Sequence, residues 1–219
     1  MVKAVVFDLD GTLVDSREDL IAAVNFTRQS FYFPPLPNNI VMSFIGDGNK
    51  KLVERSIDGS EIDFEKAFKV FTEYYMAHIA DNTTLYSGVL EVLEGLTRLQ
   101  AKLAILSNKN ELFSKTICDR LGITKYFSII AGGDTYGSLK PDPKGLFRIL
   151  KTLGCKKEYS WFVGDSHIDL QVARLGGIKK CFCSYGYGRK ENEKADLEIA
   201  SIQEFLQNIE KFRKNYHFI

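Results

Sequence analysis

Two carboxylates, Asp8 and Asp10, stand near the start of the chain, directly after the apolar run 4–7. That run predicts a short buried strand. Two ionised carboxylates so close together repel each other, so we expect a cation beside them. A few carboxylate oxygens together with water are the ligands that Mg²⁺ takes in proteins. The pair therefore predicts a magnesium site at the end of the first strand.

Three further polar clusters stand at or near the ends of predicted strands. They are, in chain order, Ser107-Asn108-Lys109, Lys140-Pro141-Asp142-Pro143 and Gly164-Asp165-Ser166-His167-Ile168-Asp169. In a parallel sheet the carboxyl ends of the strands lie at one edge, and open α/β sheets bind their ligands there. Acids, a lysine, a hydroxyl and backbone amides gathered at one edge suit a phosphoryl group held by a divalent metal.

The segments that must position these clusters alternate between strand and helix from residue 85 onward. Apolar runs predict strands at 102–106, 127–131, 160–163 and 178–183. Helical spacing of apolar residues predicts helices at 89–99, 111–121, 143–153, 167–175 and 201–212. Such alternation is typical of a parallel sheet covered by helices on both faces. The predicted fold class is therefore α/β, with a Rossmann-like parallel sheet.

An all-helical zone, residues 15–84, separates the first predicted strand from the others. It opens with a Ser-x-x-Asp pattern, Ser16 to Asp19, which predicts a capped helix start. Apolar residues then recur at helical spacing, and no strand-rich segment interrupts them. The simplest organisation is an α/β core domain, residues 1–14 and 85–219, interrupted by an inserted helical domain.

The composition limits the classes of partner. The chain has 219 residues, 45% of them hydrophobic, and a formal net charge of +1. This balance gives no basis for binding nucleic acid or a membrane, and no apolar run is long enough to span a bilayer. Four cysteines without zinc-site spacing are expected to be reduced thiols. We expect a cytoplasmic monomer or homodimer whose partner is a small molecule.

Taken in order, four motifs resemble those of the haloacid dehalogenase superfamily across the whole chain. They are Asp8-Leu9-Asp10-Gly11-Thr12-Leu13-Val14-Asp15-Ser16, Ser107-Asn108, Lys140-Pro141 and Gly164-Asp165-x3-Asp169. The helical insert after the first motif resembles the cap of that family. Dehalogenases lack the second acid, because a halide leaves without a proton. The presence of Asp10 therefore favours a phosphate ester or anhydride as substrate.

The resemblance implies a role for each matched residue. Asp8 would be the nucleophile that forms an aspartyl-phosphate, and Asp10 would be the general acid and base. Asp8, the backbone carbonyl of Asp10 and Asp165 would hold Mg²⁺. Lys140 would be catalytic by neutralising charge, and Asp169 would act through water or orient Lys140. The residues expected to contact the phosphate are Leu9, Asp10, Ser107, Asn108 and Lys140.

The insert also bears on the substrate. Its segment 44–55 is similar to the Gly-x-Gly-x3-Leu-x2-Arg stretch of phosphoglycolate phosphatases. We expect substrate contacts from this segment at Gly46, Gly48, Asn49 and Lys50. The resemblance implies a phosphatase for a small phosphorylated metabolite, with 2-phosphoglycolate first. The alternatives are an isomerase resembling β-phosphoglucomutase, and a phosphatase or pyrophosphatase for another small phosphate compound.

Overall fold

The computed structural model describes residues 2–215, and its centre is one parallel sheet. The sheet has six strands in the order β5-β4-β1-β6-β7-β8. Their bounds are β1 (Ala4–Phe7), β4 (Lys102–Leu106), β5 (Phe127–Ala131), β6 (Ser160–Gly164), β7 (Lys179–Cys183) and β8 (Leu197–Ile199). The predicted α/β class with a parallel sheet is confirmed. Strand β8 was not predicted, because three residues with a glutamate in the middle form no apolar run.

Strand β1 lies in the middle of the sheet and pairs in parallel with β4 on one side and β6 on the other. In this register Phe7 lies level with Ile105 and Val163. The loops after all three strands therefore leave the sheet at the same edge. This register brings Asp8 close to the residues directly after β4 and β6.

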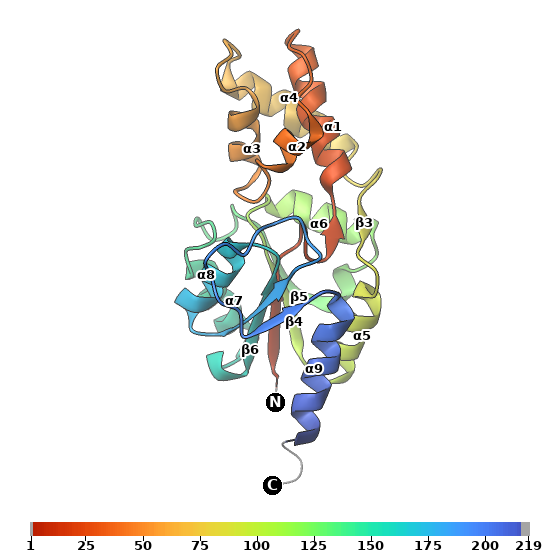
Figure 1. Ribbon diagram of the computed structural model, residues 1–219, viewed down its shortest axis with the longest axis vertical. Helices are drawn as coiled ribbons and strands as arrows, with labels where there is room; N and C mark the ends of the chain where they lie inside the picture. The colour runs from red at the N-terminus through yellow and green to blue at the C-terminus, as the bar shows by residue number, and fades with distance from the viewer. Residues whose placement is uncertain (1, 216–219) are drawn as a thin grey trace.

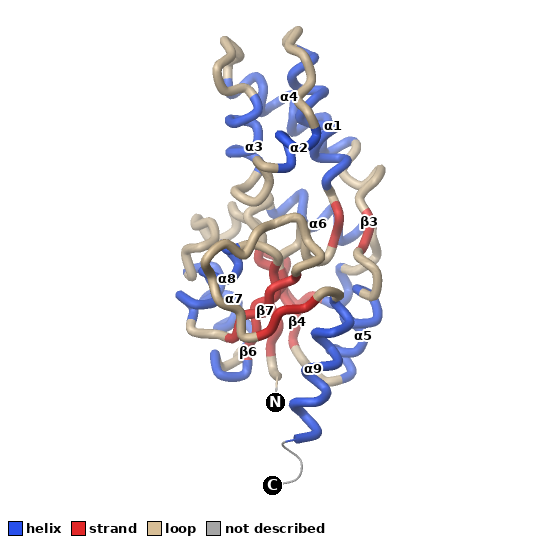
Figure 2. Tube along the Cα trace, viewed as in Figure 1, coloured by secondary structure: helices blue, strands red, loops and turns tan. Residues whose placement is uncertain are grey.

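Helices cover both faces of the sheet (Figure 2). The helices of the core are α5 (Val89–Arg98), α6 (Glu111–Arg120), α7 (Lys144–Leu153), α8 (His167–Gly176) and α9 (Ile202–Asn215), with short 3-10 turns η1 (Thr124–Tyr126) and η2 (Lys157–Tyr159). Val5 and Phe7 pack with α5 and α9 on one face, while Ala4 and Val6 pack with α7 and α8 on the other. Because side chains alternate along a strand, β1 is buried on both sides and holds the loop at its carboxyl end in place.

Four helices between residues 15 and 84 form a unit above the carboxyl edge of the sheet (Figure 1). We call this unit the helical insertion; it contains α1 (Arg17–Ser30), α2 (Asn38–Met42), α3 (Asn49–Ser56) and α4 (Phe64–Ala77). Two short antiparallel strands, β2 (Val14–Asp15) and β3 (Thr84–Leu85), pair where the chain enters and leaves it. Two-residue strands carry no periodic signal, so the sequence did not predict them. No helix within residues 2–215 has both the length and the apolar character needed to cross a bilayer.

The predicted capping role of Ser16 and Asp19 is wrong. Ser16 makes no side-chain cap at α1, and its hydroxyl donates instead to Asp10. The Asp19 carboxylate accepts the backbone N–H of Thr83 at 2.8 Å and of Asn82 at 3.0 Å. Both side chains are buried where the chain enters and leaves the helical insertion. Residues distant in the sequence supply their polar partners there, and a local sequence pattern does not reveal such partners.

Candidate active site

A buried lysine joins the first and fourth motifs. Lys140 Nζ lies 2.8 Å from Asp8 Oδ1 and 2.6 Å from Asp169 Oδ1. The other oxygen of Asp169 accepts from the backbone N–H of Ser166 at 3.0 Å and from its hydroxyl at 2.6 Å. These bonds are part of a capping box at the start of α8. Asp169 is therefore held by α8, and in turn it holds Lys140 against Asp8.

The charges of this cluster shift one another's pKa values. Burial raises the pKa of Asp8 to about 6; Asp169 adds to the rise and Lys140 opposes it. Burial also raises the pKa of Asp165 well above its usual value. Burial would lower the pKa of Lys140, but Asp169 and Asp8 outweigh it, and the net pKa is raised. Lys140 therefore stays positively charged. The raised pKa values of Asp8 and Asp165 show that nearby positive charge does not fully compensate their ionised forms.

The donor set fits a divalent metal ion. One carboxylate oxygen each from Asp8, Asp165 and Asp169 lies within 4.8 Å of the others. Asp8 Oδ1 is buried, and apart from the ion pair with Lys140 at 2.8 Å it has no partner among the described residues. Both oxygens of Asp169 are already engaged, so Asp8 and Asp165 are the carboxylates with room for a cation. Mg²⁺ prefers carboxylate oxygens as ligands, and its charge would compensate the buried negative charges of Asp8 and Asp165, whose pKa values are raised.

Replacing Lys140 tests how far the buried charges depend on it. We expect Lys140→Met to lower the free energy of unfolding by about 3 kcal/mol near neutral pH, because Asp8 and Asp169 lose their counter-charge. Lys140 opposes the raised pKa of Asp8, so its loss raises that pKa further, and protonation should reduce the penalty as pH falls.

The measurement is urea unfolding at about pH 7 and about pH 5 without added metal. Lys144→Met removes an exposed lysine at the start of α7 and should change stability by no more than about 0.5 kcal/mol. A loss for Lys140→Met as small as this control at about pH 7 would contradict the charge assignment.

Glycine-containing loops hold Asp165 from two sides. The backbone N–H of Gly188 donates to Asp165 Oδ2 at 2.7 Å. A Cβ added to Gly11 would lie 2.1 Å from the same carboxylate, and one added to Gly186 would lie 2.4 Å from Asp165 Cβ. Only glycine permits this approach, which brings the first motif and the loop 186–188 against Asp165.

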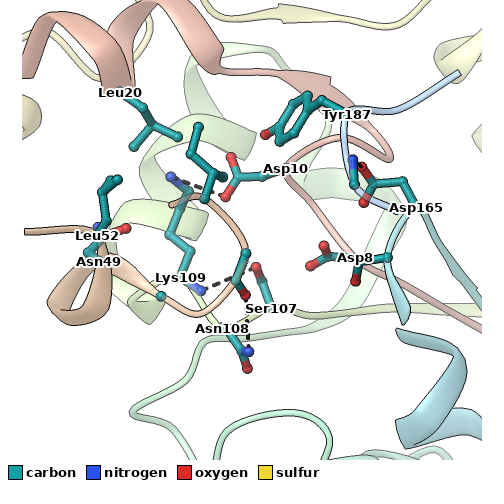
Figure 3. Close-up of a pocket in the computed structure, with 15 residues that line it drawn as sticks. Asp8, Asp10, Leu20, Asn49, Leu52, Ser107, Asn108, Lys109, Asp165 and Tyr187 are labelled. Atoms are coloured by element: carbon teal, nitrogen blue, oxygen red, sulfur yellow. Dashed lines mark hydrogen bonds and ion pairs between the residues drawn. The ribbon is translucent and has the colours of Figure 1, made fainter. Parts of the chain in front are cut away.

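Asp10 is held by residues to which the sequence assigned no such role. Ser16 donates to Asp10 Oδ1. Lys109 Nζ lies 3.2 Å from Asp10 Oδ2 (Figure 3). The Tyr187 hydroxyl lies 3.2 Å from Ser16 Oγ. Lys109 also lies beside Tyr75 of the helical insertion, with Nζ and Oη 2.7 Å apart. Its position directly after Ser107-Asn108 was the only signal in the sequence.

The positive charge of Lys109 persists although the side chain is buried. Burial alone would lower its pKa, but Asp10 and Tyr75 outweigh that effect, and the pKa of Lys109 is raised. Lys109 therefore brings a fixed cation to the carboxylate of Asp10.

Ser107 and Asn108 differ in what they offer a ligand. Ser107 is buried and lines the cavity, and its oxygen accepts the backbone N–H of Lys109 at 3.3 Å. The side chain of Asn108 is fully occupied: it accepts from the backbone N–H of Lys140 at 2.7 Å and donates to the carbonyl of Gly46 at 3.2 Å. Asn108 thus connects the loop after β4 to the helical insertion.

The cavity between the core and the helical insertion has a volume of about 50 Å³. The lining residues from the sequence-predicted set are Asp8, Asp10, Ser107, Asn108, Asp165, Gly46, Gly48 and Asn49. Lys50 is exposed and lies outside the lining, as does His167. Leu20, Ile45 and Leu52 also line the cavity and were not singled out in the sequence.

The two remaining cations of the segment 44–55 are engaged with acids of the helical insertion. Arg55 pairs with Asp47 and donates to the carbonyl of Phe44 at 3.3 Å. Lys51 pairs with Glu54 at 2.8 Å on the exposed side of α3. Both pairs lie within the helical insertion, and Arg55 holds the loop that precedes α3.

This arrangement defines an enzyme with an α/β core and a carboxylate-rich site at the carboxyl edge of its sheet. A helical insertion covers the site. Phosphate chemistry fits the site, because acids that can hold a metal stand beside a buried lysine. The chain belongs to the haloacid dehalogenase-like hydrolases, whose family profile matches residues 5–183.

Within this family, the chain is similar to phosphoglycolate phosphatases. The chain is 39% identical over 209 residues to the phosphoglycolate phosphatase of Chromobacterium violaceum, covering 93% of this chain and 94% of that protein. It is 35% identical over 221 residues to the phosphoglycolate phosphatase of Neisseria meningitidis serogroup A, covering 95% and 94%. The solved structure of a predicted phosphoglycolate phosphatase from Haemophilus somnus has a TM-score of 0.90 at 29% identity, covering 95% of this chain and 98% of that chain. The protein is a phosphoglycolate phosphatase-like enzyme of this family.

Proposed function

We propose that the protein is a Mg²⁺-dependent phosphatase that releases inorganic phosphate from 2-phosphoglycolate. The similarity to the phosphoglycolate phosphatases of Chromobacterium violaceum and Neisseria meningitidis supports this choice of substrate. The observation that carries the proposal is the buried cluster in which Lys140 joins Asp8 to Asp169, with Asp165 beside them. We also propose that residues 15–84 act as a cap domain over a core of residues 1–14 and 85–219.

Each residue of the site has a task in this proposal. Asp8 attacks the phosphorus, forming an aspartyl-phosphate as the bond to the leaving oxygen breaks. Asp10 gives its proton to that oxygen and then takes a proton from the attacking water, which releases phosphate and restores Asp8. Lys140 and the Ser107 hydroxyl stabilise the negative oxygens of the phosphate, together with backbone N–H groups of residues 9, 10 and 108.

Mg²⁺ would be held by Asp8, Asp165 and the backbone carbonyl of Asp10. When bound it would screen the phosphate charge that otherwise repels the nucleophile. The packing of Gly11 against the Asp165 carboxylate supports this set, because it brings the backbone of the first motif next to that ligand.

The size of the cavity favours a small substrate. Its volume of about 50 Å³ leaves room for roughly four water molecules beside the catalytic groups. A phosphate ester of either size therefore needs the helical insertion to move, and a hexose phosphate, the substrate class of the isomerase alternative, needs a larger movement than a two-carbon ester. This difference favours a two-carbon phosphate ester over a sugar phosphate.

Measurement of released phosphate tests the substrate. We expect a higher kcat/KM for 2-phosphoglycolate than for other small phosphate esters, sugar phosphates and pyrophosphate in the presence of Mg²⁺. β-Glucose 1-phosphate is included, and its conversion is followed both as phosphate and as glucose 6-phosphate. Conversion of this sugar without phosphate release would instead identify an isomerase.

The stabilisation of the protein by Mg²⁺ is expected to depend on pH. The raised pKa of Asp8, about 6, means that the metal-free native state holds a proton that the unfolded chain loses near pH 4. Metal-free stability therefore falls as pH rises through this window, while the site becomes available to the cation. At 100 times its Kd at about pH 7, Mg²⁺ should add about 2.7 kcal/mol to the free energy of unfolding, and the same concentration should add less at about pH 5.

Urea unfolding with and without Mg²⁺ at the two pH values measures this difference. In Asp165→Asn, which loses a proposed ligand, the cation should add little at either pH. An equal effect of Mg²⁺ on the unaltered protein at both pH values would count against carboxylate ligation.

A further inference from the structure

Lys109 is a buried cation whose place in the cavity the catalytic steps above do not use. Its side chain is 1% exposed, and it reaches from the loop after β4 to the helical insertion, where Nζ meets the Tyr75 hydroxyl. Among the described residues that line the cavity, it alone carries a positive charge. Lys140, the other buried lysine nearby, lies between Asp8 and Asp169 and does not line the cavity.

Asn49 offers a donor without an acceptor. It lines the same cavity, is 9% exposed, and its Nδ2 has no hydrogen-bond partner. A buried amide donor without an acceptor is costly, and a ligand oxygen would remove that cost. Figure 3 shows Asn49 and Lys109 on the side of the cavity away from Asp165.

The start of α3 also favours an anion in this part of the cavity. Asn49 is the first residue of this helix, and the N-cap residue Gly48 supplies no side-chain cap. The first N–H groups of a helix lack partners within it and favour negative charge. A Cβ at Gly48, which has a φ of +91°, would lie 2.8 Å from the carbonyl oxygen of Asn108, so the helix start lies close against the core loop.

We infer that Lys109 and Asn49 form a subsite for a carboxylate of the substrate, separate from the place of its phosphate. The inference rests on the proposed phosphatase function and adds which residues choose the substrate. A carboxylate is flat and can accept from the ammonium of Lys109 and from the Asn49 amide at the same time. An alkyl group there would leave the Asn49 amide without an acceptor and would add no anion to Lys109 beyond Asp10.

A matched pair of substrates tests the subsite. 2-Phosphoglycolate carries the carboxylate, and ethyl phosphate has the same two-carbon skeleton without it. For Lys109→Met we expect the ratio of kcat/KM for these two substrates to fall roughly 100-fold, the upper range for a hydrogen bond to a charged group. Asn49→Ala should lower the same ratio roughly 10-fold. Lys69→Met removes an exposed lysine from α4 and should leave the ratio unchanged.

The ratio separates the subsite from two other roles of Lys109. If Lys109 only positioned Asp10 or braced Tyr75, Lys109→Met would slow both substrates equally, and that result would overturn the inference. Asn49→Ala does not remove a contact to Asp10, so an unchanged ratio in this variant also overturns it, even if Lys109→Met fails to fold.

Failure of the proposed function looks different. The unaltered enzyme would then hydrolyse 2-phosphoglycolate poorly but another phosphate ester well. The variants are in that case compared on phospholactate and isopropyl phosphate, which again differ only in the carboxylate. An equal loss on this second pair would reject the subsite independently of the preferred substrate.

Discussion

Asp8→Asn is expected to lower kcat for phosphate release by about 10⁴-fold or more, the scale seen when an enzyme loses its nucleophile. An amide has almost the same shape as a carboxylate but does not attack phosphorus. The fold should persist, because Asp8 is buried, and burial raises its pKa by disfavouring the charge that the amide lacks. The loss is thus chemical and should leave Mg²⁺-free stability near neutral pH undiminished.

Two measurements check this result. Phosphate release under saturating substrate gives kcat, and the mass of the acid-quenched protein shows whether a phosphoryl group becomes attached. The unaltered enzyme should gain that mass during turnover and Asp8→Asn should not. Asp58→Asn makes the same substitution at an exposed aspartate of the helical insertion and should keep full activity. Activity of Asp8→Asn within tenfold of the unaltered enzyme would be incompatible with a covalent role for Asp8.

Asp10→Asn is expected to have the second largest effect, and its size should depend on the leaving group. For an alkyl phosphate, whose alkoxide needs a proton, we expect a loss of about 10³-fold in kcat/KM. An aryl phosphate with an acidic phenol should lose much less, because its oxygen leaves readily without a proton. Asparagine can keep the contact to Ser16, so the geometry around position 10 should survive.

The test is a series of esters with leaving groups of increasing pKa. A plot of log kcat/KM against that pKa should be steeper for Asp10→Asn than for the unaltered enzyme. Ser16→Ala removes a group that orients Asp10 without removing the acid, so it should change the slope in the same direction but less. Parallel lines for Asp10→Asn and the unaltered enzyme would rule out proton donation by this residue.

The core of the fold was predictable from local pattern. Each of the predicted core helices is present with its ends shifted by a few residues, and β1, β4, β5, β6 and β7 lie where the apolar runs stand. Such runs are informative because a parallel strand buried on both faces tolerates few polar residues. The catalytic candidates were predictable for the same reason: Asp8 and Asp165 come directly after buried strands, so the strand ends place them.

The contacts between the core and the helical insertion were not predictable in this way. Ser16 has the spacing of a helix cap, yet its hydroxyl donates to Asp10, because Ser16 is buried next to that carboxylate directly after β2. Tyr75 has the spacing of a core aromatic, and it is one, but its hydroxyl lies beside Lys109, 34 positions away along the chain. Periodicity reports which face of a helix is buried, and it says nothing about which polar atom that face will meet.

Local residue pattern was enough to specify the α/β alternation, the helical insertion and the four motifs at the strand ends, because strand burial and strand direction depend on neighbouring residues. Tertiary packing was needed to bring Tyr75 of the helical insertion to Lys109, and to turn Ser16 toward Asp10. These residues come from elements whose relative placement depends on how the helical insertion packs over the sheet. That packing is set by the shapes of many side chains together, which no short stretch of sequence encodes.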